Sequence, residues 1–182
     1  MIVINHFLKM MEGCSLTIGK FDGLHVGHMS LIHKIINYGR ELEIPSVVFT
    51  FERRQNSILH QNPPILTDEQ KFYILEKEGL DILIQHPFDK LFGMSAEEFC
   101  DNIFNVMKCR ALVVGKNFRF GSQRKGDVES LRQYAREKGA LLDVQETIII
   151  DGEPVSSSRI RKLVENKDFT NANRLLGRKC FS

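Results

Sequence analysis

The chain has 182 residues, of which 42% are hydrophobic and 26% are charged, and its formal net charge is +2 at pH 7. This length and composition are typical of one globular domain with a full apolar core. A charge this close to zero lacks the dense basic face of polyanion-binding proteins, so nucleic acid is not expected as a partner. No apolar run approaches the roughly 20 residues of a membrane span, so no membrane partner is expected.

The cysteine pattern and the start of the chain indicate a compartment. The four cysteines form no C-x-x-C pair, and the start MIVINHFLKMMEGCSL lacks the basic and apolar regions of a signal peptide. We therefore expect a reduced, cytoplasmic protein. The sequence contains no internal repeat or linker, so residues 1–182 are expected to form a single domain of undetermined oligomeric state.

The first half of the chain alternates short apolar runs with amphipathic stretches. Its patterns predict strands at 15–19, 46–51 and 81–85, with a helix at 28–42 between the first two. A capping box at Thr67 predicts a second helix, which ends near residue 79. Residues 52–66, which include two prolines, predict a long loop of the kind that is often functional.

The second half continues the alternation. A capping box at Ser95 opens a helix that is expected to end near residue 108, and a strand follows at 111–115. Asp127 is expected to cap a helix that ends at residue 139. Residues 141–150 are strand-like, and a tight Asp-Gly turn then leads to two short helices within 156–182.

Alternation of strands and helices predicts an α/β fold with a Rossmann-like, doubly wound, mostly parallel sheet and helices on both faces. Ligands of such sheets bind beyond the carboxyl ends of the strands. The expected site therefore lies in the loops that follow the strands.

The stretch IGKFDGLHVGH, residues 18–28, joins the first expected strand to the first helix. A helix amino end favours anions, and Gly23 and Gly27 would let the backbone approach one closely. His25 and His28 lie one turn apart, so both imidazoles can donate hydrogen bonds to one phosphate chain. Two alternatives are a zinc site, which lacks a third nearby ligand, and incidental surface histidines.

A second stretch, VSSSRIR at 155–161, places three hydroxyls and two arginines at an expected helix start. Such a group either binds an anion or simply caps the helix with two solvated arginines. Together with the H-x-G-H motif at residues 25–28, VSSSRIR predicts a second phosphate contact, opposite the first.

These motifs, in this order, resemble those of the H-x-G-H nucleotidyltransferase superfamily. Within it, the chain resembles the FMN adenylyltransferase module of bacterial bifunctional riboflavin kinase/FAD synthetases. The resemblance rests on TIGKFDGLHVGH, FTFE, PPILT, EGLDILI, FDKLFGMSAEEF, VVGKNFRFG, VSSSRIR and ANRLLGR. It departs after FTFE, where Arg53-Arg54-Gln55 replaces the family's usual Pro-His-Pro.

The resemblance implies transfer of AMP from ATP to FMN, giving FAD and pyrophosphate, with Mg²⁺ held mainly by phosphates and no protein metal ligands. It also implies a single domain, with C-terminal helices in 156–182 and no riboflavin kinase barrel, so that riboflavin is not phosphorylated. The implied catalytic residues are His25, His28, Ser157 and Arg161. The implied ATP-binding residues add Gly19, Phe21, Asp22, Gly23, Gly27, Ser156 and Arg159, and the FMN-binding residues are Thr50, Asn117, Phe118, Arg119, Phe120 and Asp127.

Alternatives to this function remain open. One is a sister transferase that acts on another phosphorylated small molecule, and another is a catalytically weak module that binds and senses flavin or nucleotide. Class I aminoacyl-tRNA synthetases share a similar signature, but this chain is short and nearly neutral for a tRNA-binding protein. For Phe118 and Phe120, packing of at least one ring into the core is the competing expectation.

Overall fold

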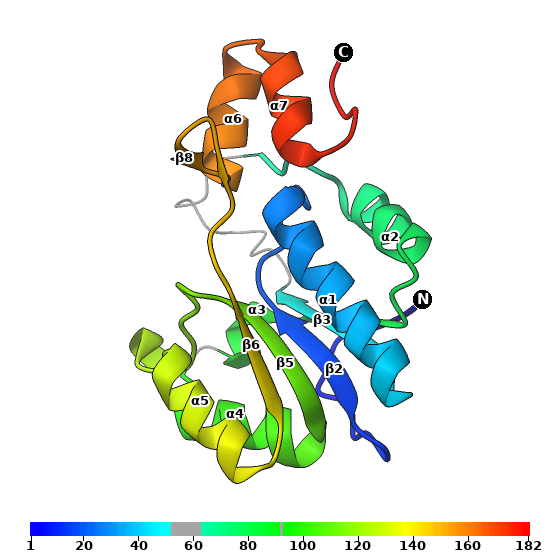
Figure 1. Ribbon diagram of the computed structural model, residues 1–182, viewed down its shortest axis with the longest axis vertical. Coiled ribbons are helices and arrows are strands. Elements are labelled where there is room, and N and C mark those ends of the chain that lie inside the picture. Colours follow the sequence, from blue (N-terminus) through cyan, green and yellow to red (C-terminus); the bar gives the residue numbers. More distant parts are fainter. Residues whose placement is uncertain (52–62, 92) are drawn as a thin grey trace.

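The computed structural model describes residues 1–51, 63–91 and 93–182. A sheet in the order β1-β4-β3-β2-β5-β6 forms its centre, and every neighbouring pair of strands is parallel (Figure 1). The prediction of a doubly wound, mostly parallel α/β fold is confirmed. In this order along the sheet the strands are Ile2–Ile4, Ile82–His86, Ser46–Phe51, Cys14–Ile18, Cys109–Gly115 and Leu141–Gln145.

The strand order places a switch point at the middle of the sheet. From β2 the chain moves to β3 and β4 on one side, then crosses to β5 and β6 on the other side. Neighbouring loops after β2 and β5 therefore leave the sheet in opposite directions, which opens a crevice at their carboxyl ends. Both IGKFDGLHVGH and NFRFG begin at this crevice.

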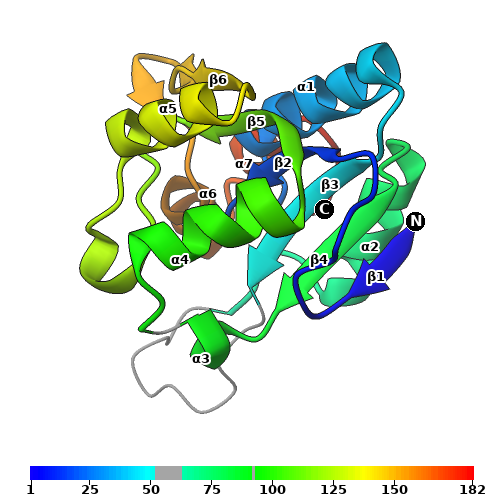
Figure 2. The ribbon, with the colours of Figure 1, turned by 90° about the horizontal axis from the view of Figure 1, so that it is seen from below.

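Helices cover both faces of the sheet because successive strand residues point to opposite sides (Figure 2). Val47 and Phe49 pack in the same cluster as Phe99 and Leu131, whereas Val48 packs with helix α1. One face carries α1 (Val26–Leu42) and α2 (Asp68–Lys77). The other carries α4 (Ala96–Asp101), which continues into a π-helical turn (Asn102–Val106), and α5 (Val128–Glu137).

The last part of the chain forms a small unit with its own core. It contains a hairpin of β7 (Ile149–Ile150) and β8 (Glu153–Pro154), then α6 (Ser157–Glu165) and α7 (Phe169–Leu176). Its buried side chains form a separate cluster that includes Ile160 and Leu175. Figure 1 shows α6 and α7 beyond the amino end of α1, at the carboxyl edge of the sheet.

Most predicted elements are confirmed. Thr67 and Ser95 form the expected capping boxes, and Asp127 caps α5. Asp151 and Gly152 have φ values of 56° and 77°, which fits a tight hairpin turn.

The differences concern short elements and boundaries. Helix α1 begins at Val26, before the predicted residue 28, and the strand predicted at 141–150 is interrupted after β6. Edge strand β1, helix α3 (Phe88–Leu91) and the 3₁₀ turn Ser122–Arg124 were not predicted. The loop expected at 52–66, including Arg53-Arg54-Gln55, lies mostly outside the described residues. No helix in the described part of the chain is long and apolar enough to cross a membrane.

Candidate functional site

The loop that follows β2 carries several residues in the left-handed region of backbone conformation. Phe21, Gly23 and Leu24 have φ values of 47°, 84° and 46°. A Cβ on Gly23 would also lie 3.0 Å from the Ile65 side chain, so glycine is needed there for both conformation and space. The loop thereby turns sharply into the amino end of α1.

His25 is the N-cap of α1, and its ring orientation is fixed by the backbone. Its Nδ1 accepts a hydrogen bond from the backbone N–H of His28 at 3.3 Å. In the neutral ring the proton must then be on Nε2, which makes that atom a donor. The His25 and His28 rings stack with centroids 3.6 Å apart, and Phe21 packs edge-on against His28 at 5.2 Å.

Burial keeps both histidines neutral. Desolvation lowers the pKa of His25 from 6.5 to about 4, and the nearby positive charge of Arg178 adds to this effect. The pKa of His28 is also well below its usual value, through burial and the proximity of His25 and Arg178. The His28 Nδ1 is buried and has no hydrogen-bond partner within the described residues. The pair therefore suits hydrogen bonding to an anion better than proton transfer near pH 7.

Gly27 leaves room for this pair. A Cβ at this position would lie 3.2 Å from the Nδ1 and Cε1 atoms of the His25 ring. The sequence motif suggested that Gly27 lets a ligand approach; its observed neighbour is His25. Its assignment to ATP binding stays a prediction.

Ser157 and Arg161 reach the same loop from α6. The Ser157 hydroxyl donates to the backbone carbonyl of Asp22 at 2.8 Å, and the Arg161 guanidinium pairs with the Asp22 carboxylate. Arg161 Nε also donates to the Pro63 carbonyl at 3.2 Å. The two predicted phosphate contacts are thus brought together, with Asp22 between them.

Ser156 and Arg159 have other partners. The Ser156 hydroxyl caps α6 by accepting the Arg159 N–H at 3.2 Å. The Arg159 guanidinium donates to the Ile150 and Glu153 carbonyls at 2.9 and 3.1 Å, so it holds the β7–β8 hairpin. These contacts correspond to the alternative of an ordinary helix cap for Ser156. Binding of ATP by Ser156 and Arg159 stays a prediction, and these contacts do not favour it for Arg159.

Gly19 and Thr50 support the loop from neighbouring strands. The Gly19 N–H donates to the Phe49 carbonyl at 3.0 Å, and the buried Thr50 hydroxyl donates to the Lys20 carbonyl at 3.0 Å. Thr50 therefore contacts the loop that follows β2, and its predicted contact with FMN is untested.

The NFRF stretch follows β5 at the same edge of the sheet. Phe120 is 5% exposed and packs on Phe99 with ring centroids 5.4 Å apart, which confirms that at least one aromatic ring belongs to the core. Phe118 is half-buried and stacks on Phe120, while Asn117 is exposed. Arg119 forms an ion pair with Asp127 at 3.1 Å. This leaves Asn117 and one face of Phe118 as the parts of the stretch best placed to meet a ligand.

Arg178 is a residue to which the sequence motifs assigned no role. Its guanidinium donates to the Leu24 carbonyl at 2.6 Å and also to the Gly23 carbonyl. In the sequence it ends the ANRLLGR motif, directly after Gly177, the left-handed C-cap of α7. That position predicts a helix end and gives no indication of a contact with residues so far away in the sequence.

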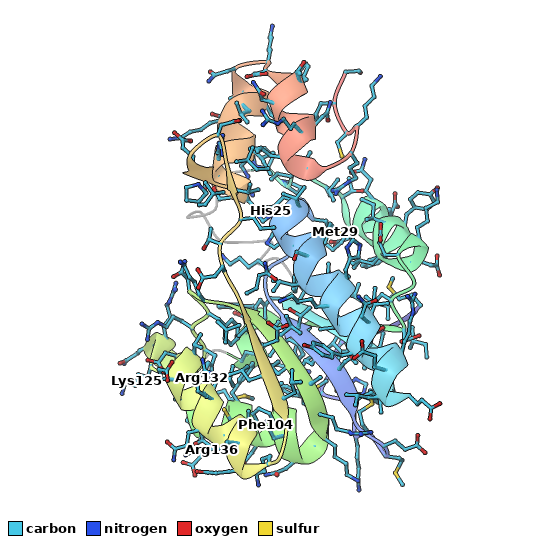
Figure 3. The ribbon with its side chains drawn as sticks, in the orientation of Figure 1. His25, Met29, Phe104, Lys125, Arg132 and Arg136 are labelled. Carbon is cyan, nitrogen blue, oxygen red and sulfur yellow. The ribbon has the colours of Figure 1, made fainter. Side chains whose placement is uncertain are left out.

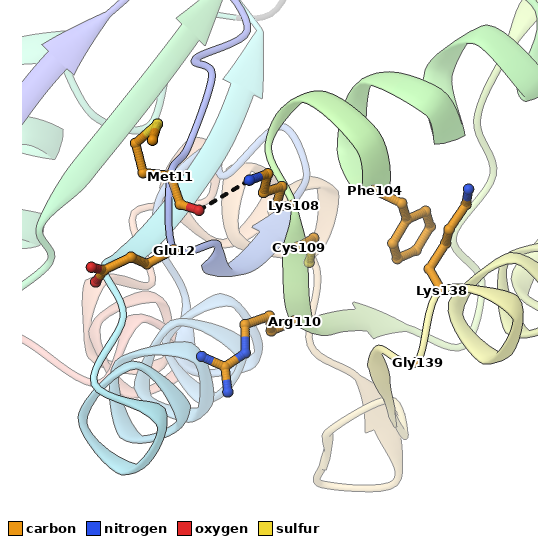
Figure 4. A pocket seen from close by; sticks show the side chains of 8 residues that line it. All are labelled: Met11, Glu12, Phe104, Lys108, Cys109, Arg110, Lys138 and Gly139. Atoms are coloured by element: carbon orange, nitrogen blue, oxygen red, sulfur yellow. Dashed lines mark hydrogen bonds between the residues drawn. The ribbon is translucent and has the colours of Figure 1, made fainter.

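A separate depression of about 300 Å³ lies at the other end of the sheet (Figure 4). It is lined by residues such as Cys109 at the start of β5 and Gly139 before β6, and Lys108 crosses it to donate to the Met11 carbonyl at 3.1 Å. In Figure 3, His25 lies at the amino end of α1, far above Phe104, which also lines this depression. Because ligands of doubly wound sheets bind at the carboxyl edge, the His25 region is the better candidate site.

Among residues 1–51, 63–91 and 93–182 there is no group of three or more His, Cys, Asp or Glu side chains that could hold a metal ion. Asp22, the carboxylate in this loop, is paired with Arg161.

Comparisons with known proteins agree on one family. A family model described as FAD synthetase matches residues 8–159. The chain is 31% identical over 178 residues to the bifunctional riboflavin kinase/FMN adenylyltransferase of Haemophilus influenzae, a match that covers 93% of this chain and 57% of that protein. It is 34% identical over 171 residues to the protein of the same name from Pseudomonas fluorescens, covering 92% and 55%. The chain thus spans just over half the length of these relatives.

A solved structure of a macrolide-efflux protein from Streptococcus pneumoniae has a similar fold. The TM-score is 0.82 at 24% identity, over 98% of this chain and 71% of that one. At this identity the likeness supports the fold and says nothing of the activity.

Proposed function

This chain belongs to the FAD synthetase family, and from that premise we propose that it transfers the adenylyl group of MgATP to FMN, giving FAD and pyrophosphate. An oxygen of the FMN phosphate attacks the α-phosphorus of ATP, and the bond from that phosphorus to the β-phosphate bridging oxygen breaks. The nucleophile is already an anion at neutral pH, because the second pKa of a phosphate monoester is near 6. No general base is required, so the protein acts by positioning and by stabilising charge.

The observation that carries the proposal is the stacked His25–His28 pair at the amino end of α1. His25 is neutral and has its Nε2–H available as a donor, because Nδ1 is occupied by the His28 N–H. Donors fixed before the reaction stabilise developing negative charge without a cost of reorganisation. We assign His25 and His28 to the oxygens of the α- and β-phosphates.

Ser157 and Arg161 would act from the other side of the triphosphate. In the described arrangement Arg161 is paired with the Asp22 carboxylate. We propose that an ATP phosphate replaces this carboxylate as the partner of Arg161. Mg²⁺ would enter bound to the ATP phosphates, because it commonly uses few protein ligands.

The FMN side is proposed from position alone. Asn117 and Phe118 follow β5, beside the loop that follows β2 across the switch point. FMN placed between these two loops would bring its phosphate toward the histidine pair. Phosphorylation of riboflavin, which the relatives' names include, is not part of this proposal.

The test is to incubate the purified protein with MgATP and either FMN or riboflavin, and to separate the flavins by chromatography. FAD formed from FMN supports the proposal. Binding of FMN without any product would favour the flavin-sensing alternative. FMN formed from riboflavin would contradict the expectation that this chain lacks kinase activity.

A matched pair of variants tests the role of the histidines. His28→Ala should lower the rate of FAD formation by roughly two to three orders of magnitude, because it removes a donor to developing charge. His33 lies on the same helix but is exposed and pairs with Glu78 at 2.7 Å, so His33→Ala serves as the control with a near-normal rate. Near-normal FAD formation by His28→Ala would refute the assignment.

A further inference from the structure

Three consecutive carbonyls of the loop after β2 are bound by the C-terminal unit. The Asp22 carbonyl accepts from the Ser157 hydroxyl at 2.8 Å, and the Leu24 carbonyl accepts from Arg178 Nη1 at 2.6 Å. The Gly23 carbonyl, between them, accepts from Arg178 Nη2. One guanidinium therefore spans two neighbouring peptide groups across more than 150 residues of sequence.

These contacts determine where the loop's amide donors point. In a trans peptide the N–H of the next residue points opposite to the carbonyl, and the chain has no cis bond in its described part. The N–H groups of Gly23, Leu24 and His25 are thus directed away from Ser157 and Arg178. Within the described ranges none of these three N–H groups takes part in a hydrogen bond. As far as the described residues go, these N–H groups are open to an anion at the amino end of α1.

The loop conformation needs such support. Leu24 has a φ of 46°, a left-handed conformation that is unfavourable for a residue with a branched side chain and persists where surrounding contacts impose it. Gly177 lets the end of α7 pack closely against α1, because a Cβ at Gly177 would lie 2.9 Å from the Val26 side chain in the first turn of α1. The end of α7 and the start of α1 are therefore in direct contact, with Arg178 between α7 and the loop.

The positive charge of Arg178 is not neutralised by a carboxylate among the described residues. None of the ion pairs between described residues involves Arg178, and its Nε is buried without a hydrogen-bond partner there. This distinguishes it from Arg161, Arg159 and Arg174, each of which has a carboxylate partner.

We propose that Arg178 is a positioning residue for adenylyl transfer: it holds the Gly23 and Leu24 carbonyls so that the neighbouring amide N–H groups face the ATP phosphates. This inference rests on the proposed function for its reaction. It concerns a residue beyond the segment 8–159 that the family model matches. In this arrangement the C-terminal unit positions the loop that would bind the phosphates.

The test compares Arg178→Ala and Arg178→Lys with Arg174→Ala. Arg174 lies on α7, four residues before Arg178, and pairs with the exposed Asp151 at 2.9 Å, so its loss should leave the rate unchanged. Loss of the guanidinium should lower kcat for FAD formation roughly a hundredfold, with the KM for FMN unchanged. A displacement of about 1 Å in groups that position a substrate can reduce the rate by about that factor. The lysine variant keeps the charge but cannot span two carbonyls, so we expect a similar loss. Guanidinium chloride at low, non-denaturing concentration should restore part of the alanine variant's rate and leave the control unaffected.

Thermal unfolding of each variant separates positioning from folding. Rates within about threefold of wild type for both Arg178 variants, or losses that match the unfolded fraction at the assay temperature, would overturn the inference.

Calorimetric titration with MgATP alone tests the role of Arg178 separately from the proposed function. If wild type makes no FAD but binds MgATP about tenfold more tightly than Arg178→Ala, the inference stands and the proposed function fails. Equal affinities overturn the inference, and a wild-type protein that neither binds MgATP nor makes FAD overturns both.

Discussion

The stability of this protein should depend on pH through His25. In the folded protein burial lowers the pKa of His25 from 6.5 to about 4. The unfolded chain, where the pKa is near 6.5, therefore binds more protons than the folded one between these two values. Stability from this group is complete above pH 6.5, falls as the pH drops toward 4, and is lost below it.

The size of the effect follows from the shift. Each pKa unit corresponds to about 1.4 kcal/mol, so the full loss is about 3 kcal/mol, of which about 2 kcal/mol falls between pH 7.5 and pH 5. The variant His25→Asn isolates this contribution, because asparagine is a good N-cap and its side-chain oxygen can still accept the His28 N–H. It removes the titrating ring and keeps the cap.

The assay is urea unfolding of wild type and His25→Asn at pH 7.5, 6 and 5. Wild type should lose about 2 kcal/mol more free energy of unfolding than the variant between the two extremes. His28 is present in both proteins, and burial is the largest cause of its lowered pKa, so the difference between them reports mainly His25. Parallel pH dependences for the two proteins would show that His25 is not held neutral by burial, and would remove the basis for its role as a fixed donor.

Three further variants test other contacts. Gly27→Ala places a Cβ 3.2 Å from the His25 ring, so FAD formation should fall roughly tenfold. Since alanine favours the helix, the free energy of unfolding should change by less than about 1 kcal/mol, and an unchanged rate would contradict the packing role of Gly27. Asp22→Asn leaves Arg161 without its carboxylate and should destabilise by roughly 1–3 kcal/mol in urea unfolding; no change would mean that the pair contributes nothing. Thr67→Ala removes the N-cap of α2 and should cost about 1 kcal/mol in thermal unfolding without altering FAD formation.

Much of the fold could be predicted because its signals are local. Capping boxes such as that of Ser95 and Glu98 involve residues three apart, so their hydrogen bonds can be read from the sequence. The alternation of apolar runs with amphipathic stretches is equally local, and it was enough to predict a doubly wound sheet. The short edge strand β1 was missed because it pairs with β4, about 80 residues away, and three residues carry no periodic pattern.

The candidate site was predicted only in part. The sequence placed His25 and His28 at the amino end of a helix, and the structure stacks their rings there. Arg159 sits two residues from Arg161 in the same motif, yet it holds the β7–β8 hairpin while Arg161 reaches Asp22. Spacing along a helix cannot distinguish these partners, because each depends on which distant segment packs beside that face.

The sequence by itself determined the order of the longer strands and helices, the position of the glycine- and histidine-rich loop, and the residue types available to a phosphate. These depend on interactions between residues a few positions apart. The tertiary structure decided that the two histidines are neutral, that Arg161 is paired with Asp22, and that Arg178 holds the Gly23 and Leu24 carbonyls. Burial, charge and long-range hydrogen bonds exist only once the C-terminal unit has packed against the start of α1, so no local pattern could have revealed them.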